Sequence, residues 1–159
     1  MRSFVIQIVI FVVIFQVISM IRETSMLSTD TQVVENQYVL DSTVGDKVNL
    51  ATNKRTILYF FAPWCSVCHV SIANLQQTYQ KNPNINVIAI GLDFMEKEEI
   101  DNFVARHELT FPVVYGNEKV KHDFQITGYP SYYVLNEENT IVNKSMGYST
   151  EIGLYLRSL

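Results

Sequence analysis

The chain has 159 residues, of which 48% are hydrophobic and 18% are charged, and its formal net charge is −4 at pH 7. This length allows one globular domain and a short appendage. The negative balance leaves no basic patch, which argues against nucleic-acid binding. The two cysteines have no second Cys or His pair at ligand spacing, which argues against a zinc site.

The first element is an uncharged, apolar run over residues 4–21. As a helix it would be about 27 Å long, just enough to span the hydrocarbon core of a bilayer. Arg2 precedes the run, so the positive-inside rule places the N-terminus in the cytoplasm and the rest of the chain across the membrane. We therefore expect a signal anchor or transmembrane helix over 1–22 that contacts the lipid bilayer through residues 4–21.

The same segment would also suit a cleaved signal peptide, because Val17 and Ser19 are small enough for cleavage before Met20. The apolar run continues past that point without a helix-breaking residue, which favours an uncleaved anchor. Residues 23–36 are polar and unpatterned, and predict a linker between the membrane and a folded domain over 37–159. The expected location is the inner membrane, with a single pass and the domain facing the periplasm or cell exterior.

Beyond the linker, short β-rich runs alternate with helical spacing, which predicts an α/β sandwich around one mixed sheet. In the first long helix, Val67, Ile72, Leu75 and Tyr79 are able to share one apolar side. The predicted strands are 38–40, 48–50, 56–61, 87–92, 132–135 and 140–144, with a strand or connection at 111–115. The predicted helices start at 67, 96, 117 and 151, and the last carries Ile152, Leu154, Tyr155 and Leu156.

Two cysteines follow the predicted central strand, Thr56–Phe61, after a break at Pro63. A strand, a tight turn and a helix place Cys65 at the helix N-terminus. Unpaired N–H groups and the helix dipole favour a thiolate there, which is the form of cysteine that attacks disulfides. Cys65 and Cys68 are therefore candidates for a redox-active pair.

Other interpretations of this pair remain open. A structural disulfide across two intervening residues would close almost no chain, so it would contribute little stability. Cys65, Cys68 and His69 also fit the C-x-x-C-H pattern of c-type haem attachment. That pattern usually occurs in a small helical setting and not directly after a buried strand, so a redox dithiol is the interpretation we favour.

Three spaced motifs give the chain a family resemblance: Trp64-Cys65-Ser66-Val67-Cys68, Phe111-Pro112 and Gly128-Tyr129-Pro130-Ser131. In this order they resemble the thioredoxin superfamily, and within it the TlpA-like membrane-tethered thiol–disulfide oxidoreductases, particularly the protein disulfide oxidoreductase branch. The resemblance covers roughly residues 37–159. It implies a thioredoxin-like three-layer sandwich, a central mixed sheet flanked by helices.

The resemblance also implies roles for individual residues. Cys65 would be the attacking cysteine and Cys68 the buried resolving one. Pro130 would be a cis proline facing the dithiol, the backbone of Tyr129 would pair with an extended substrate, and Trp64 would pack beside the sulfurs. No cofactor beyond the redox-active disulfide Cys65–Cys68 is implied. The implied partners are protein thiols and disulfides and a membrane electron donor or acceptor; a peptide-binding module without turnover is the alternative.

The chain departs from the family pattern where a proton acceptor for Cys68 is expected. Tyr59 stands where thioredoxin has a buried Asp, and Ser71 where many TlpA-like reductases have a Glu. Water is then the default acceptor, with Tyr59 and His69 as further candidates. The sequence does not fix the direction of electron flow, although we slightly favour a reductase.

Three other polar residues carry weaker expectations. His107 and His122 fall on polar helix faces, which predicts that they are solvated. Asp93 follows a predicted strand, where it would either face the site or cap the next helix.

Overall fold

The computed structural model describes residues 6–14, 17 and 24–159 of the chain, and the remainder of the predicted anchor lies outside the described residues. Residues 6–14 form a helix. No helix among the described residues is both long enough and apolar enough to cross a membrane. The anchor over 1–22 therefore stays a prediction.

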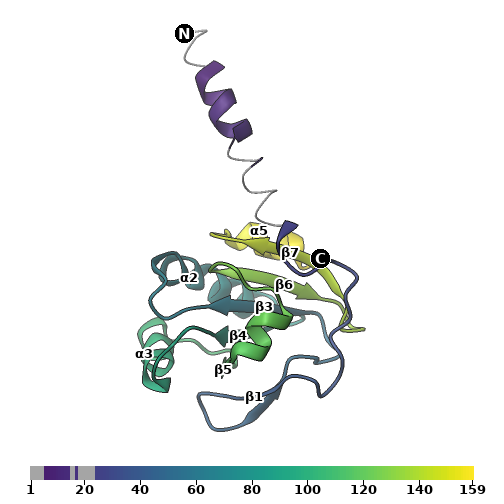
Figure 1. Cartoon of the computed structure of the whole chain (residues 1–159), viewed down its shortest axis with the longest axis vertical. Helices are drawn as coiled ribbons and strands as arrows, with labels where there is room; N and C mark the ends of the chain where they lie inside the picture. Colours follow the sequence, from purple (N-terminus) through teal and green to yellow (C-terminus); the bar gives the residue numbers. More distant parts are fainter. Residues whose placement is uncertain (1–5, 15–16, 18–23) are drawn as a thin grey trace.

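The domain is built on a five-stranded mixed sheet with the order β5-β4-β3-β6-β7 (Figure 1). β3, β4 and β5 are parallel, and β6 runs antiparallel to β3. β7 pairs antiparallel with β6 and therefore runs in the same direction as β3. A separate two-stranded sheet pairs β1 with β2. The strands are β1 Val39–Asp41, β2 Lys47–Asn49, β3 Thr56–Phe61, β4 Asn86–Gly91, β5 Val113–Tyr115, β6 Ser131–Leu135 and β7 Ile141–Met146.

Helices cover both faces of the five-stranded sheet, which gives three layers. The green helix α4 crosses in front of the sheet in Figure 1. One core lies between the sheet and α2, α3 and α5, and the other lies between the sheet, α4, β1 and the segment before β1. The helices are α2 Ser66–Lys81, α3 Lys97–His107, α4 Glu118–Asp123 and α5 Glu151–Arg157.

The central strand β3 is buried along its whole length, as predicted. Successive side chains of a strand point to opposite faces of the sheet. Ile57, Tyr59 and Phe61 accordingly belong to the core under α2, while Leu58 and Phe60 belong to the core under α4. Burial on both faces holds the end of β3 in place, and the cysteine turn starts there.

The prediction that residues 23–36 form a free linker is wrong from Met26 onward. Met26 and Val33 are buried in the domain core. The N–H of Leu27 donates to the Tyr133 hydroxyl at 2.9 Å, and the Lys144 ammonium donates to the carbonyls of Met26 and Leu27. The physical reason is that β7 is an edge strand, whose start pairs its backbone with this segment.

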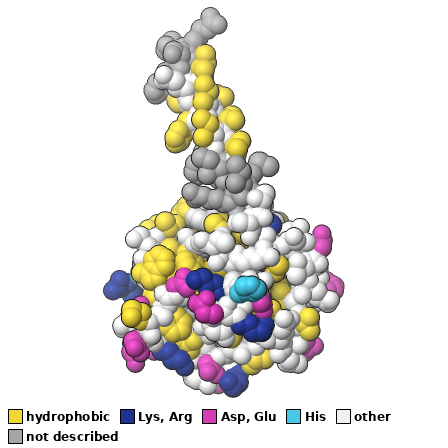
Figure 2. All heavy atoms as spheres, viewed as in Figure 1, with side chains coloured by type: hydrophobic (Ala, Val, Ile, Leu, Met, Phe, Trp, Pro, Cys, Tyr) yellow, Lys and Arg dark blue, Asp and Glu magenta, His cyan; other side chains and the backbone are white. Residues whose placement is uncertain are grey.

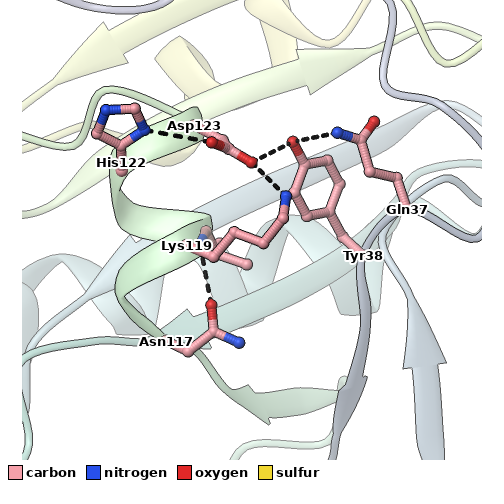
Figure 3. A network of polar contacts seen from close by, with 7 residues as sticks. Gln37, Tyr38, Asn117, Lys119, His122 and Asp123 are labelled. Atoms are coloured by element: carbon pink, nitrogen blue, oxygen red, sulfur yellow. Dashed lines mark hydrogen bonds and ion pairs between the residues drawn. The ribbon is translucent and has the colours of Figure 1, made fainter.

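A polar network fastens the next part of the segment to α4 (Figure 3). The Tyr38 hydroxyl donates to the Asp123 carboxylate at 2.9 Å, and Lys119 Nζ contacts the same carboxylate at 2.5 Å. Gln37 donates to the Tyr38 hydroxyl at 2.9 Å, and the Tyr38 ring packs on Phe124. The folded domain therefore begins before residue 37.

Two predicted apolar faces are corrected by the structure. Val67 is 44% exposed, because the buried stripe of α2 runs through Cys68, Ile72 and Leu75. On α5 only Leu154 is buried, since this short helix contacts α2 along one side and leaves its other apolar residues, Ile152, Tyr155 and Leu156, exposed.

Candidate active site

Cys65 and Cys68 form a disulfide at the N-terminus of α2. Cys65 is the N-cap, and its sulfur accepts the backbone N–H of Cys68 at 3.1 Å. Cys65 is 6% exposed and Cys68 is fully buried. Solvent therefore reaches the pair from the side of Cys65.

The peptide bond between Tyr129 and Pro130 is cis, as the family resemblance implied. The Trp64 and Tyr129 rings pack edge to face, with centroids 5.8 Å apart. Within the described part of the chain, the backbone N–H and C=O of Tyr129 make no hydrogen bond. Pro130 is buried and its own carbonyl accepts the N–H of Gly147.

A pocket of about 240 Å³ opens beside Cys65. It lies between the cysteine turn, the loop after β4, α4 and the segment that leads to Pro130. Cys65 and Tyr129 both line it. Its lining residues are Trp64, Cys65, Asp93, Lys121, Ile126, Thr127, Gly128 and Tyr129.

Asp93 joins three walls of this pocket. Its carboxylate accepts the Tyr129 hydroxyl at 3.0 Å and pairs with Lys121 Nζ at 2.6 Å. Its backbone carbonyl accepts the Trp64 indole N–H at 2.9 Å. The residue has φ 50°, in the left-handed region, where Asp is tolerated better than most residues.

From the sequence, Asp93 was expected either to face the site or to cap the following helix. The structure puts it at the site, because α3 is capped by Glu96. The available signal was its place just after a parallel strand, since ligands of α/β proteins bind outside the carboxyl ends of such strands.

The charges around the pocket are fixed by these contacts. Burial first, and then the hydrogen bond to Asp93, raises the pKa of the Tyr129 hydroxyl, so it stays protonated and remains a donor. The hydrogen bond to Asp93 raises the pKa of Lys121, which stays cationic. The ion pair leaves the rim of the pocket close to neutral.

Behind the disulfide lies a cluster of buried hydroxyls. The Tyr59 hydroxyl is 3.1 Å from Ser71 Oγ and 3.4 Å from the carbonyl oxygen of Cys68. Burial raises the pKa of Tyr59 well above its ordinary value, so this phenol is not a base at neutral pH. The neighbouring Tyr132 hydroxyl is buried and has no partner among the described residues. A role for Tyr59 in proton transfer stays a prediction.

His69 contacts a residue that was predicted to be solvated. Its Nδ1 lies 2.7 Å from His107 Nε2, and its Nε2 lies 2.9 Å from the carbonyl oxygen of Pro63. The prediction for His107 is wrong because α3 packs against the start of α2 and turns this side chain toward His69. His122, with a side chain 90% exposed, lies on the surface as expected.

The two occupied ring nitrogens of His69 also bear on the haem interpretation. A c-type haem needs the cysteines as thioether attachment points and the histidine as an iron ligand. Here the cysteines are bonded to each other, and both nitrogens of His69 are engaged by protein groups. Within the described residues, no group of three or more His, Cys, Asp or Glu side chains is placed to hold a metal ion.

A thioredoxin-like sandwich with a Cys-x-x-Cys disulfide at a helix N-terminus, close to a cis proline, defines a thiol–disulfide oxidoreductase. The chain belongs to the AhpC/TSA family, whose model matches residues 32–144. The match starts within the segment that the structure places on the domain.

Individual relatives agree with this class. The thioredoxin-like protein YneN of Bacillus subtilis is 26% identical over 119 residues, which are 72% of this chain and 70% of YneN. The thiol-disulfide oxidoreductase ResA of Oceanobacillus iheyensis is 26% identical over 149 residues, which are 88% of this chain and 77% of ResA. In fold, the chain is similar to a putative thiol:disulfide interchange protein DsbE from Chlorobium tepidum. That similarity has a TM-score of 0.73 and 19% identity, and covers 84% of this chain and 99% of the other.

Proposed function

We propose that this protein is an exported, membrane-anchored oxidoreductase that exchanges disulfides with protein substrates through Cys65 and Cys68. The observation that carries the proposal is the asymmetry of the pair. Cys65 lies at the edge of a pocket and at a helix N-terminus, while Cys68 is buried behind it. One cysteine is placed to attack a substrate and the other to resolve the product.

In the reductive direction, the Cys65 thiolate attacks one sulfur of a substrate disulfide. The Cys65–substrate bond forms, the substrate S–S bond breaks, and the other substrate sulfur leaves as a thiolate that takes a proton. Cys68 then loses its proton and attacks Cys65, which releases the second substrate thiol and re-forms the Cys65–Cys68 disulfide. Two electrons pass to the substrate, and the reverse sequence oxidises a dithiol.

Substrate selection is assigned to the pocket beside Cys65. The free N–H and C=O of Tyr129 are available to an extended substrate backbone, in the manner of an added β-strand. Trp64 and the Tyr129 ring form an aromatic wall for the neighbouring substrate side chain. This arrangement favours unfolded or flexible protein segments over compact ones.

The reductive direction requires a source of electrons, because the exported compartment is oxidising. We assign that role to a membrane protein with a thiol pair, which would reduce the Cys65–Cys68 disulfide after each turnover. The direction itself follows from the reduction potential of the pair.

Anchoring through residues 4–21 is part of the proposal. Its support is the apolar sequence, together with the helix at 6–14, whose apolar side chains are exposed (Figure 2). Ile10 is 52% exposed and Phe11 is 71% exposed. Side chains of this kind are stable in lipid rather than in water.

The catalytic proposal is tested by trapping. Cys68→Ser should accumulate mixed disulfides between Cys65 and exported proteins, visible on non-reducing gels and lost on reduction, because the resolving step is blocked. The matched Cys65→Ser variant should trap nothing. Adducts on Cys68 in the Cys65→Ser variant would reverse the assigned roles.

The anchor is tested separately. A reporter fused after Leu159 that functions only when exported should be active, and the protein should stay with membranes through a carbonate wash. A soluble mature form starting at Met20 would show that the segment is a cleaved signal peptide.

A further inference from the structure

Two histidines meet beside the N-terminus of α2 although they are 38 residues apart in the sequence. His69 comes from the first turns of α2, and His107 is the last residue of α3. Besides the 2.7 Å contact between them, each ring packs against Phe103 with a centroid distance of 4.7 Å. Both rings are therefore held on more than one side.

The hydrogen bonds determine where the protons lie. A carbonyl oxygen only accepts, so the bond to Pro63 requires a proton on His69 Nε2. In the neutral pair, His69 Nδ1 then accepts the N–H of His107 Nε2. One further proton fits on His107 Nδ1, which has no partner among the described residues, and it leaves both hydrogen bonds intact. A second additional proton would have to bind His69 Nδ1, so that two N–H groups would face each other across the 2.7 Å contact. The pair therefore binds one additional proton as a unit.

Few charged groups face this pair. From α3, Glu99 and Arg106 line the same pocket of about 220 Å³ as His69, and the Glu99 carboxylate is engaged by the N–H groups of Met95 and Glu96. The first turn of α2 has no acidic residue. The pKa of His107 is lowered mainly by burial, and to a smaller extent by His69 and Arg106. His107 is therefore neutral at pH 7 in the oxidised protein.

The pair is attached to the turn that carries Cys65. The backbone N–H of His69 donates to the Cys65 carbonyl at 3.2 Å, and its ring is bonded to Pro63, two residues before Cys65. Reduction of the disulfide creates a thiolate at Cys65. A new negative charge close to an imidazole favours the protonated imidazole.

We propose that the His69–His107 pair takes up one proton when the Cys65–Cys68 disulfide is reduced, and so acts as the counter-charge that positions and stabilises the Cys65 thiolate. The inference rests on the proposed oxidoreductase function. A dithiol donor gives two electrons and two protons and becomes a disulfide. The Cys65–Cys68 bond breaks, one proton binds Cys68, the other binds the histidine pair, and Cys65 remains a thiolate.

Proton NMR of the imidazole C–H groups in oxidised and dithiothreitol-reduced wild-type protein tests this directly. The titration of the His69–His107 pair should move to higher pH on reduction by about two pH units, a roughly hundredfold gain in proton affinity that lets the pair bind most of one proton. His122 is an internal control, because its exposed side chain on α4 should titrate identically in both states. Identical titration of all three histidines in the two redox states would overturn the proposal.

The proposal can also be tested in the opposite direction, through the effect of the histidine pair on the pKa of Cys65. If the thiolate raises the proton affinity of the pair, the protonated pair lowers the pKa of Cys65 by the same number of pH units. His107→Gln keeps an N–H donor toward His69 Nδ1 but does not titrate, so it should raise the Cys65 pKa by up to that amount, measured by thiolate absorbance or alkylation rate against pH. The control His122→Gln should not change it.

The outcomes separate this proposal from the function it rests on. A disulfide that reacts normally with dithiothreitol, with an unchanged Cys65 pKa in His107→Gln, would refute the role of the histidine pair alone. A wild-type disulfide that does not exchange with dithiols at all would refute both.

Discussion

Asp93 and Tyr129 are 36 residues apart in the sequence, and their side chains meet across the pocket beside Cys65 through a hydrogen bond of 3.0 Å. The same aspartate binds the indole of Trp64 through its backbone and Lys121 through its second carboxylate oxygen. Asp93 therefore holds residues that line the same pocket as Cys65, although it makes no bond to the Cys65 sulfur.

Asp93→Asn should weaken exchange with protein disulfides. Asn tolerates the left-handed backbone and keeps the bond from Trp64, but it replaces a charged acceptor of the Tyr129 hydroxyl and loses the ion pair with Lys121. A loss of about 1 kcal/mol in positioning corresponds to a roughly fivefold slower reaction. Exchange with a small disulfide such as oxidised glutathione should change less, because it needs little of the Tyr129 backbone.

The matched control is Asp101→Asn. Asp101 accepts the Tyr115 hydroxyl in the same kind of pair, and neither residue lines the pocket beside Cys65. It should leave both exchange reactions unchanged. Equal losses in the two variants, or equal losses on the two substrates in Asp93→Asn, would contradict a positioning role for Asp93.

Tyr59→Phe tests the buried hydroxyls behind Cys68. The free energy of unfolding should fall by about 1–2 kcal/mol, because Ser71 and the Cys68 carbonyl lose a buried partner. The raised pKa keeps the phenol neutral, so the pH profile of exchange between about pH 6 and 9 should keep its shape.

Tyr133→Phe removes another buried hydroxyl, which is bonded to Leu27 and Phe124 away from the disulfide, and serves as the control. An inflection that disappears in Tyr59→Phe and persists in Tyr133→Phe would identify Tyr59 as the proton acceptor after all.

Asp123 should make stability depend on acid. Hydrogen bonds from Lys119, His122 and Tyr38 lower its pKa from 3.8 to about 2 in the folded chain (Figure 3). A carboxylate with a depressed folded pKa stabilises the fold above its unfolded pKa, and that contribution is lost as pH falls toward 2. Asp123→Asn should therefore melt below wild type at pH 6 and converge with it near pH 2.

Thermal melts across this pH range measure the effect. Asp41→Asn is the control, since the Asp41–Lys47 pair is largely exposed at both ends and should contribute little. Melting curves of Asp123→Asn and wild type that stay parallel from pH 6 to about pH 2 would exclude the network as a stabilising contact.

The features that sequence analysis predicted correctly are local. The β-rich run, the break and the Cys-x-x-Cys spacing all lie within residues 56–68. The position of the disulfide can therefore be predicted from this segment alone. The motif around Pro130 is equally compact. Asp93 was left undecided because its role depends on a left-handed backbone and on partners in two other segments, neither of which residue type encodes.

Two of the errors, at His107 and in the predicted linker, share a physical cause, which is contact between segments distant in sequence. His107 lies on a face of α3 that is polar in composition, and only the packing of α3 against α2 turns it toward His69. Residues 26–33 have too few apolar positions for a periodic signal. They are ordered by backbone pairing with the edge strand β7 and by burial of Met26 and Val33.

Turnover of the Cys65–Cys68 pair is measured most directly by the reduction of insulin disulfides with dithiothreitol in the presence of this protein. Wild-type protein in catalytic amounts should accelerate the reaction, Cys65→Ser should abolish the acceleration, and Cys68→Ser should stall as a mixed disulfide. A wild-type rate equal to that of dithiothreitol alone would contradict the account and leave a peptide-binding module with an inactive dithiol.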